Sequence, residues 1–332
     1  MHLEPPSGVH RLSLNENLFL PKELILSITR RALELIDPRL YADVYGEGLA
    51  EKLAEFHDVD MREIIVGPGA DYIIYLLASL GREGVVIVEP TFEEYERAAC
   101  LFGAPVTKIL LGEDFSLIPS RIRQASGRIV YMASPNNPTG NQYDKAAVEE
   151  VADSVESIIV VDEAYAEYGR YTLIHEAPSL NNLVVVRTFS KAWGLAGLRV
   201  GYAVTNAELA KKLKEKGRVF ATSILSLKAA ELMLDHWHEV SKAVEEAKLV
   251  RDWLIGEIAH IAKPYHSDAN FVMIRLPFRS DKIREELLKR GFAIKDISMK
   301  PLCENCIRVT VAPKQISEKF LQAFREVIQS LA

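Results

Sequence analysis

A lysine and an arginine stand eight positions apart in the stretch 188–202, which is rich in small and hydroxyl-bearing residues. The lysine, Lys191, follows an apolar run typical of a buried strand, and its amine can form a Schiff base with an aldehyde. The guanidinium of Arg199 and the hydroxyls of Thr188 and Ser190 can together hold a phosphate. The stretch therefore predicts a site for a compound with both groups, such as pyridoxal 5′-phosphate (PLP). The competing interpretation is a solvated lysine at a strand end, so the prediction depends on the residues upstream.

Asp162 closes a second apolar run, at residues 158–161. A carboxylate at the carboxyl end of a parallel strand faces the crevice in which ligands bind. There it can keep the pyridine nitrogen of PLP protonated, so that the ring accepts electrons from a substrate carbanion. Tyr165 lies three residues further on and can donate a hydrogen bond to the phenolate oxygen of PLP. The competing interpretation of Asp162 is the N-cap of a helix that begins at Ala164.

Two turns follow other predicted strands. Residues 134–140 read SPNNPTG and hold Asn137 in front of a proline, where its amide can bind the same phenolate oxygen. Residues 67–71 read GPGAD and form a glycine-rich junction between a strand and a helix. Free amides and the helix dipole at Ala70 and Asp71 favour a phosphate there. Taken alone, either turn is explained equally well as a simple connection between a strand and the next element.

An aromatic residue, Phe92, follows the strand predicted at residues 84–88. Its ring can stack on the face of the pyridine, although an aromatic residue at a helix start is also common in a core. Four strand ends thus provide an amide-rich turn, a flat ring, an amide side chain and a carboxylate, and a fifth segment provides the lysine. Because five segments agree, we favour a PLP site over the ordinary interpretation of each segment taken alone.

Short apolar runs alternate with amphipathic stretches up to about residue 236. The predicted strands are 63–66, 84–88, 106–111, 128–132, 157–161, 183–188 and 198–204. The predicted helices of this part are 72–80, 92–102, 117–124 and 146–155. Because the strands are nearly all apolar and alternate with helices, we expect an α/β fold with a mostly parallel sheet covered on both faces.

The pattern changes near residue 237. A long amphipathic helix at 237–260 is followed by strands at 271–276 and 307–311 and by helices at 280–289 and 316–331. This pattern predicts a smaller C-terminal α+β domain. We therefore expect three parts, which are an N-terminal segment (1–30) that joins the small domain or crosses the cleft, a large PLP-binding domain (31–236) and the small domain (237–332).

The composition is that of an ordinary soluble globular protein, with 48% hydrophobic and 26% charged residues. The net charge of −6 argues against nucleic acid or an anionic membrane as the main partner. No apolar run approaches the ~18 residues of a membrane span, and the first six residues do not resemble a signal peptide. Three cysteines cannot build a disulfide framework, so we expect a cytoplasmic location. Cys303 and Cys306 form a single CxxC pair, and no metal site is predicted.

Taken together, these motifs give the sequence a resemblance to the fold-type I PLP-dependent aminotransferases, and among them to the histidinol-phosphate aminotransferase family. The likeness extends from LSLNEN at 12–17 to IRVTV at 307–311. Its most specific pieces are SPNNPTG at 134–140, VDEAY at 161–165 and the stretch 188–202.

The resemblance implies a role for each candidate residue. Lys191 carries the cofactor covalently and forms the catalytic set with Asp162 and Tyr165. Asn137 shares the phenolate contact with Tyr165, and Phe92 stacks on the ring. The residues implied around the cofactor phosphate are Ala70, Asp71, Thr188, Ser190 and Arg199.

Further residues are implied at the substrate and at a second subunit. Tyr41 looks like the residue that reaches the phosphate of a partner subunit, which implies a homodimer with shared active sites. Arg308 and Asn15 match substrate-binding positions, and Arg308 would pair with the acidic end of the substrate. Lys295 stands in the run GFAIKD (291–296), where the family usually has an arginine. A lysine keeps the charge but not the fork geometry, which leaves phosphate recognition open.

The implied reaction is a ping-pong transamination from histidinol phosphate or an amino acid to a 2-oxo acid such as 2-oxoglutarate, with a place in histidine biosynthesis. Lys191 would remove the α-proton of the donor. The alternatives are an aspartate or aromatic amino acid aminotransferase, which Lys295 favours, and a decarboxylase resembling threonine-phosphate decarboxylase. A non-catalytic PLP-binding regulator is disfavoured because Lys191 and Asp162 are both present. A nucleotide-binding protein is disfavoured because no glycine pattern for phosphate binding follows the first strands.

Overall fold

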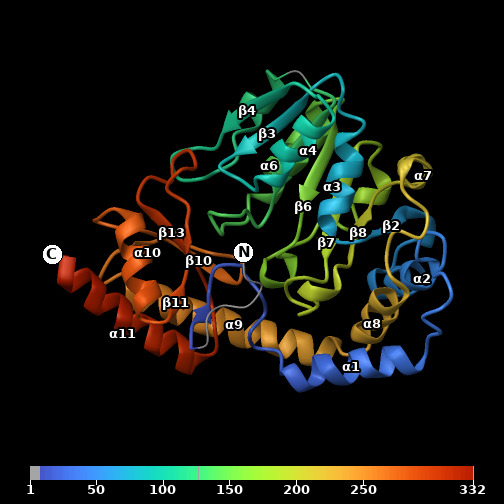
Figure 1. Cartoon of the computed structure of the whole chain (residues 1–332). Helices are drawn as coiled ribbons and strands as arrows, with labels where there is room; N and C mark the ends of the chain where they lie inside the picture. The colour runs from blue at the N-terminus through green and yellow to red at the C-terminus, as the bar shows by residue number, and fades with distance from the viewer. Residues whose placement is uncertain (1–7, 126, 332) are drawn as a thin grey trace.

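Within the residues that the computed structural model describes, 8–125 and 127–331, the largest sheet has seven strands in the order β2-β8-β7-β6-β5-β3-β4 (Figure 1). Its strands are β2 (Ile64–Gly67), β3 (Val85–Glu89), β4 (Val106–Leu110), β5 (Ile129–Ala133), β6 (Ile158–Asp162), β7 (Leu183–Thr188) and β8 (Gly201–Val204). β8 is antiparallel to both of its neighbours, and the other pairs are parallel. The predicted mostly parallel α/β sheet is therefore confirmed.

Alternate side chains of the central strands face two different cores. In β6, Ile158 and Val160 belong to one core, and Ile159 and Val161 belong to the other. The helices that pack on the first core are α3 (Ala70–Ala78), α4 (Glu94–Leu101) and α7 (Ala207–Lys216). Those on the second are α1 (Lys22–Glu34), α2 (Glu47–His57), α5 (Pro119–Arg123), α6 (Lys145–Ser154) and α8 (Ile224–Leu234). Because helices cover both faces, the central strands β5 and β6 are buried and almost entirely apolar.

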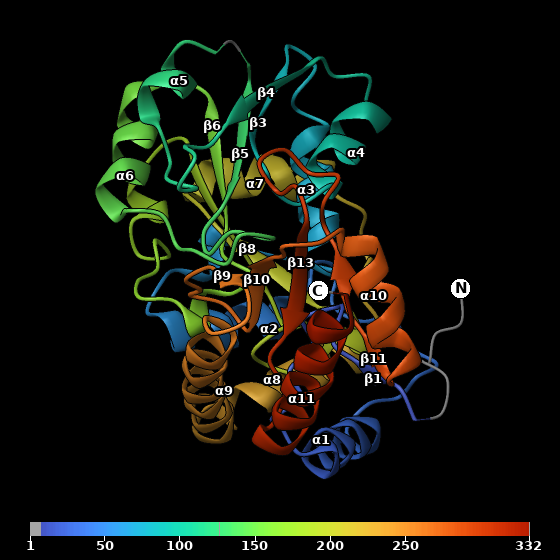
Figure 2. The ribbon, with the colours of Figure 1, turned by 90° about the vertical axis from the view of Figure 1, so that its left-hand side faces the viewer.

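A second, antiparallel sheet with the order β12-β13-β10-β9 is built from the C-terminal part of the chain (Figure 2). Its strands are β9 (Lys263–Pro264), β10 (Phe271–Arg275), β12 (Lys295–Asp296) and β13 (Cys306–Thr310). The helices α10 (Ser280–Lys289) and α11 (Lys314–Leu331) pack on it around a core of its own. The helix α9 (Trp237–Ile258) contributes Val240 and Val244 to the large-sheet core and Leu254 and Ile258 to the small-sheet core, so it connects the two.

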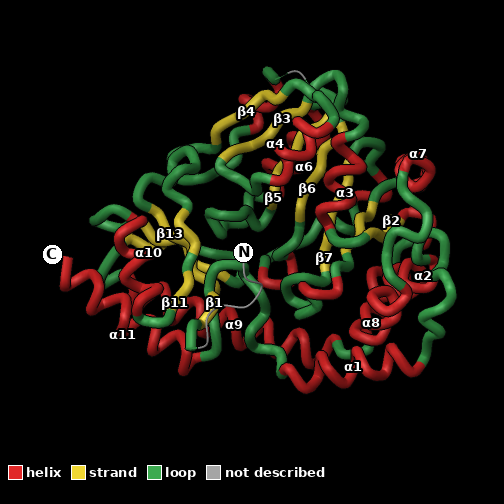
Figure 3. Tube along the Cα trace, viewed as in Figure 1, coloured by secondary structure: helices red, strands yellow, loops and turns green. Residues whose placement is uncertain are grey.

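The N-terminal segment contacts both sheets. Its strand β1 (His10–Arg11) pairs in parallel with β11 (Phe292–Ala293), beside the small sheet (Figure 3). The chain then passes toward the large sheet, where Ile28 and Ala32 of α1 are buried in the core that α8 shares. The first seven residues of the segment predicted at 1–30 lie outside the described residues.

The structure corrects one predicted strand and adds helices. The strand predicted at 198–204 begins only at Gly201, because residues 196–198 form a 3-10 turn and Arg199 has a left-handed φ of 52°. No prediction was made for α1, α2, α7 or α8. In α8 the buried positions lie on one face, but the apolar residues Ile224, Leu225 and Leu232 lie outside it, so no clear apolar stripe can be recognised. No helix in the described part of the chain combines the length and the apolarity needed to cross a membrane.

Candidate active site

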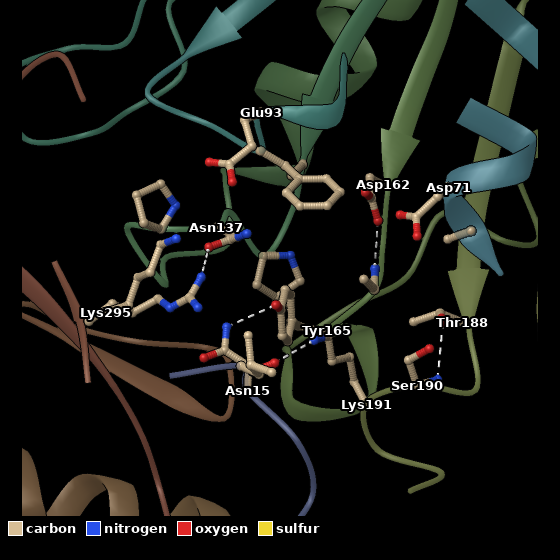
Figure 4. Close-up of a pocket in the computed structure, with 18 of the residues that line it drawn as sticks. Asn15, Asp71, Glu93, Asn137, Asp162, Tyr165, Thr188, Ser190, Lys191 and Lys295 are labelled. Atoms are coloured by element: carbon tan, nitrogen blue, oxygen red, sulfur yellow. Dashed lines mark hydrogen bonds between the residues drawn. The ribbon is translucent and has the colours of Figure 1, made fainter. Parts of the chain in front are cut away.

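A cavity of about 260 Å³ lies at the carboxyl ends of β5, β6 and β7, where residues of the N-terminal segment and the small sheet close it (Figure 4). The predicted site residues that line it are Asn15, Ala70, Asp71, Phe92, Asn137, Asp162, Tyr165, Thr188, Ser190, Lys191, Arg199, Lys295 and Arg308. Tyr41 is the one predicted site residue that does not line it. Carboxyl ends of parallel strands meet at one edge of a sheet, which explains why residues far apart in sequence converge here.

Asp162, the last residue of β6, is buried in the wall of this cavity. Its Oδ2 accepts a hydrogen bond from the Tyr95 hydroxyl at 2.7 Å, and its Oδ1 accepts one from the Ala164 amide at 3.0 Å. Burial raises the pKa of Asp162 to about 6, while these two hydrogen bonds and the charge of Lys191 oppose the increase. The carboxyl is therefore mostly ionised at pH 7 and suits a positively charged ring nitrogen. The bond to the Ala164 amide is also the local capping contact that the competing interpretation expected.

One end of the cavity is a cluster of phosphate-type donors around Arg199. Its Nη1 donates to Oγ of Ser190 at 3.1 Å, and its Nη2 donates to Oδ2 of Asp71 at 2.6 Å. The Ser190 amide donates to Oγ1 of Thr188 at 3.0 Å, which holds the hydroxyls next to each other. The N-terminus of α3, at Ala70, closes this end and adds the positive end of a helix dipole. Guanidinium, hydroxyls and helix amides form a donor set that fits the phosphate of PLP.

The approach of α3 to β8 depends on a residue without a side chain. A Cβ on Gly201 would lie 2.3 Å from the backbone nitrogen of Ala70 and 2.5 Å from the carbonyl carbon of Gly69. Such distances are far shorter than van der Waals contact, so only glycine allows the helix terminus to sit against the strand. This residue therefore sets the shape of the phosphate-type end.

Lys191 lies in the turn that follows β7. Its Nζ donates to the backbone oxygen of Leu14 at 2.9 Å and lies 5.6 Å from the centroid of the Tyr165 ring. The turn is held by the bond from the Gly194 amide to the Lys191 oxygen at 3.0 Å and by the buried ring of Phe189. The Lys191 amine and the Asp162 carboxylate line the same cavity, and Tyr165 lines it as well (Figure 4).

Asn15 connects the N-terminal segment to both sheets. Its Nδ2 donates to the Tyr165 hydroxyl at 3.0 Å, and its Oδ1 accepts a hydrogen bond from the Thr310 hydroxyl at 3.2 Å. The Tyr165 ring packs edge-on against Phe271, with centroids 5.2 Å apart. The position of the Tyr165 hydroxyl is therefore determined by residues from three distant parts of the chain.

Arg308 of β13 is 8% exposed and points its guanidinium into the cavity. Its Nη1 donates to Oδ1 of Asn137, and its Nη2 donates to the backbone oxygen of Ser13 at 2.6 Å. Its Nε has no hydrogen-bond partner among the described residues. Burial lowers the pKa of Arg308 below its ordinary value. A buried guanidinium that donates to two neutral oxygens, one of an amide side chain and one of the backbone, is suited to an anionic substrate group. Lys295 lies opposite Arg308 in the register of β12 and β13. Its side chain is exposed and lines the same cavity as Arg308.

Tyr41 lies on the surface, away from the cavity. It is 83% exposed, and its ring stacks on Phe220 with centroids 4.8 Å apart.

Three cavity residues that carry chemistry were not assigned from the sequence, namely Tyr95, Glu93 and Lys300. Tyr95 lies three residues after Phe92, and this spacing could have suggested that both residues face the same cavity. Lys300 comes from an irregular loop, where no periodic signal exists. It lines the cavity although the loop is far from every predicted motif.

Comparisons with known proteins show the family to which the chain is similar. The aminotransferase class I and II family matches residues 8–324. The histidinol-phosphate aminotransferase of Thermococcus gammatolerans is 35% identical over 324 residues, which cover 96% of this chain and 91% of that protein. Histidinol-phosphate aminotransferase 2 of Archaeoglobus fulgidus is 34% identical over 330 residues, which cover 97% and 94%.

Solved structures agree in fold. The histidinol-phosphate aminotransferase of Sinorhizobium meliloti, in complex with pyridoxal-5′-phosphate, superposes with a TM-score of 0.90 and 24% identity. The superposition covers 100% of this chain and 96% of the other. At this identity the likeness establishes the arrangement of the elements.

Proposed function

The chain belongs to the aminotransferase class I and II family, and we propose that it transfers the amino group of histidinol phosphate to a 2-oxo acid such as 2-oxoglutarate. It is a PLP-dependent aminotransferase of fold type I. The observation that carries the proposal is that one cavity contains a lysine, a buried carboxylate and a buried arginine with neutral partners. The identity of relatives over nearly the whole chain supports histidinol phosphate as the donor.

When bound, PLP supplies an aldehyde that reacts with amines and a protonated ring that accepts electrons. We assign Lys191 to the covalent bond and Asp162 to the ring nitrogen. Asn137 and Tyr165 are assigned to the phenolate oxygen, and Phe92 is assigned to the ring face. The residues assigned to the phosphate are Ala70, Asp71, Thr188, Ser190 and Arg199.

The residues of the chain then have distinct tasks. Nζ of Lys191 would take the proton from the α-carbon of the donor and deliver it to the reacting carbon of the cofactor. In the second half-reaction it would make the reverse transfer, to the α-carbon of the acceptor. Asp162 remains ionised at neutral pH because the Tyr95 hydroxyl and the Ala164 amide donate to it. Arg308 and Asn15 orient the substrate, and Arg308 would pair with the carboxylate of the 2-oxo acid. Because the donor product leaves before the acceptor binds, ping-pong kinetics are expected.

We further propose a homodimer with shared active sites, supported by an apolar surface patch. The exposed apolar side chains of two adjacent loops are Leu40, Tyr41, Val44, Val219 and Phe220. Tyr41 stacks on Phe220, and the neighbouring Arg218 amide donates to the Tyr72 hydroxyl of α3 at 2.6 Å. The patch thus adjoins the helix whose N-terminus forms the phosphate end of the cavity. Contiguous exposed apolar surface favours association, and a second copy packed here would bring its own Tyr41 close to that end.

The proposed domain division follows the packing of α9. Its first half packs in the large-sheet core, and its second half, from Val250 onward, packs in the small-sheet core. This change supports residues 237–332 as a small domain, 31–236 as the PLP-binding domain and 1–30 as a segment that joins them. A cytoplasmic location is supported by the cysteines, since Cys100, Cys303 and Cys306 are unpaired.

The proposal is tested by adding single amines to the yellow, PLP-loaded enzyme. Histidinol phosphate, aspartate, tyrosine and glutamate are mixed with it in turn, and the loss of the absorbance of the lysine-bound cofactor is recorded. We expect histidinol phosphate to bleach the colour at the lowest concentration, and 2-oxoglutarate to restore it. If no amine bleaches the enzyme, transamination is wrong, whereas bleaching by aspartate or tyrosine alone would assign a different donor.

A further inference from the structure

Lys300 lines the cavity beside Glu93, on the side away from the phosphate-type end (Figure 4), and has no task in the mechanism above. It belongs to the loop between β12 and β13. Its Nζ donates to the backbone oxygen of Thr91 at 2.6 Å and lies 3.5 Å from Oε2 of Glu93. Because Thr91 and Glu93 flank Phe92, the lysine reaches from the small-sheet loop to a cavity wall of the large sheet.

The loop that carries Lys300 is held by its own backbone and by the small sheet. The Lys300 amide donates to the Ile297 oxygen at 3.0 Å, and the Cys303 amide donates to the Lys300 oxygen at 3.1 Å. Cys303 is buried, and Nη2 of Arg275 donates to the Leu302 oxygen at 2.6 Å. The ammonium is therefore presented from a preorganised base, which reduces the entropy lost when it binds a ligand.

This side of the cavity has a surplus of positive charge. Lys295, Lys300 and Arg308 line it, and among the described lining residues Glu93 is the carboxylate that faces them. Partial burial raises the pKa of Glu93, but the charges of Lys300 and Lys295 lower it overall. Figure 4 shows Lys295 and Glu93 on the side away from Asp71, so these charges are separate from the cofactor phosphate end.

A phosphate monoester needs more positive charge than one lysine supplies. It carries roughly −1.5 to −2 charges at pH 7, and a lysine is a compact point charge without the fork of an arginine. Lys295 alone, with its exposed side chain, neutralises about half of that charge. Lys300 is the second ammonium on the same side, and its Nζ has three N–H groups, of which the Thr91 oxygen takes one.

We propose that Lys300 determines donor specificity by binding, together with Lys295, the phosphate of a phosphorylated amino donor on this side of the cavity. The inference rests on the proposed function and extends it. Before substrate binds, Glu93 holds the ammonium in place, and the more highly charged phosphate then replaces the carboxylate as its partner. The enzyme thereby selects the phosphorylated donor over the same amine without its phosphate.

The test compares histidinol phosphate with histidinol as donors for the PLP-loaded enzyme. We expect Lys300→Ala to lower the ratio of their kcat/KM values by about tenfold to a hundredfold, the range for a hydrogen bond to a charged group. Lys300→Arg should restore most of the ratio, because it keeps the charge. Glu93→Gln should tighten binding of the phosphorylated donor by removing a repelling carboxylate. Lys289→Ala, which removes an exposed lysine of α10 paired with Glu286, is the control and should leave the ratio unchanged.

A role confined to supporting the loop would change the reaction of both donors equally. An unchanged ratio in Lys300→Ala therefore overturns the inference, as does a full loss of discrimination in Lys300→Arg. Calorimetric titration of the loaded enzyme with inorganic phosphate separates this inference from the donor assignment. Inorganic phosphate can bind more weakly to Lys300→Ala although the wild-type enzyme does not use histidinol phosphate. That result would support the anion site and reject histidinol phosphate as the donor. Phosphate binding that is the same with and without Lys300 rejects the site itself.

Discussion

The hydroxyl of Tyr95 donates a hydrogen bond of 2.7 Å to Oδ2 of Asp162, and both side chains are buried. This bond favours the ionised carboxylate and partly offsets the effect of burial on its pKa. The pair thus keeps a negative charge in a place where burial alone would remove it. Because the ring nitrogen of PLP requires that charge, Tyr95 acts on the reaction through Asp162 and is a positioning residue.

The cofactor-free protein should become more stable at neutral pH when Asp162 is replaced by asparagine. The folded pKa of about 6 exceeds the ordinary value of 3.8, so the stability contribution of this group is present below pH 4 and is lost as pH rises through 6. Ionisation of the buried carboxyl then costs about 3 kcal/mol at pH 7 by linkage. The stabilities of Asp162→Asn and of the wild type, measured by urea unfolding, should therefore diverge between about pH 4 and pH 6. Curves that remain parallel would contradict the raised pKa.

Replacing Tyr95 by phenylalanine should weaken PLP binding. Without the hydroxyl the pKa of Asp162 rises further, so a smaller fraction is ionised at pH 7. The dissociation constant of PLP should increase by about tenfold, because a buried carboxylate loses a hydrogen bond. Tyr131→Phe is the matched control, since Tyr131 stacks on Tyr95 at 4.9 Å but donates to the backbone oxygen of Ile74. Absorbance titrations measure the dissociation constant of PLP in both variants. An equal increase in the two variants would exclude a specific effect of Tyr95.

Replacing Arg199 by lysine should lower the affinity for PLP although the charge is kept. The guanidinium contacts Ser190 and Asp71 at the same time, and an ammonium does not reproduce this fork. We expect a rise of about tenfold to a hundredfold in the dissociation constant, which corresponds to the loss of one or two charge-assisted hydrogen bonds. The exposed Arg62, which pairs with Asp60, serves as the control in Arg62→Lys. Unchanged affinity in Arg199→Lys would place the phosphate elsewhere.

Shared active sites can be tested by mixing two inactive subunits. Tyr41→Ala removes the side chain proposed to reach a partner, and Lys191→Ala removes the amine that reacts. In a mixed dimer, the Tyr41→Ala subunit supplies Lys191 and its partner supplies Tyr41, so one intact site of two is restored. We expect activity to return after the two variants are unfolded together and refolded. If each variant alone is as inactive as the mixture, the sites are not shared in this way.

Gly201 should be indispensable, whereas Gly197, in the 3-10 turn just before β8, should not be. In Gly201→Ala the new methyl group would overlap the backbone of Ala70. The packed terminus of α3 would have to move to make room for it. The unfolding free energy should fall by about 2–4 kcal/mol and PLP affinity should fall with it. Gly197→Ala is the matched control, because a Cβ there has no atom within 4 Å. Denaturant unfolding checks both, and similar stability of the two variants would contradict the close approach.

The sequence was sufficient to predict the elements that carry the site. Apolar runs located most strands of the large sheet within one or two residues, and the carboxyl ends of parallel strands meet at one edge. For this reason Asn137, Asp162 and Lys191 could be expected in one cavity before any coordinates, and the structure does place them there. The roles given to them remain predictions. The strand expected at 198–204 was wrong at its start, because the turn before it depends on the left-handed conformation of Arg199.

Tertiary structure alone decided which side chains meet across the cavity. Arg308 bonds to a backbone oxygen 295 residues away, and Asn15 bonds to Tyr165 150 residues away. Lys300 reaches Thr91 from a loop that has no periodic pattern. Local spacing determines which residues stand at the end of a strand, because that depends on near neighbours along the chain. The partners of these residues depend on how two separate sheets and the N-terminal segment pack together, and no local pattern encodes that packing.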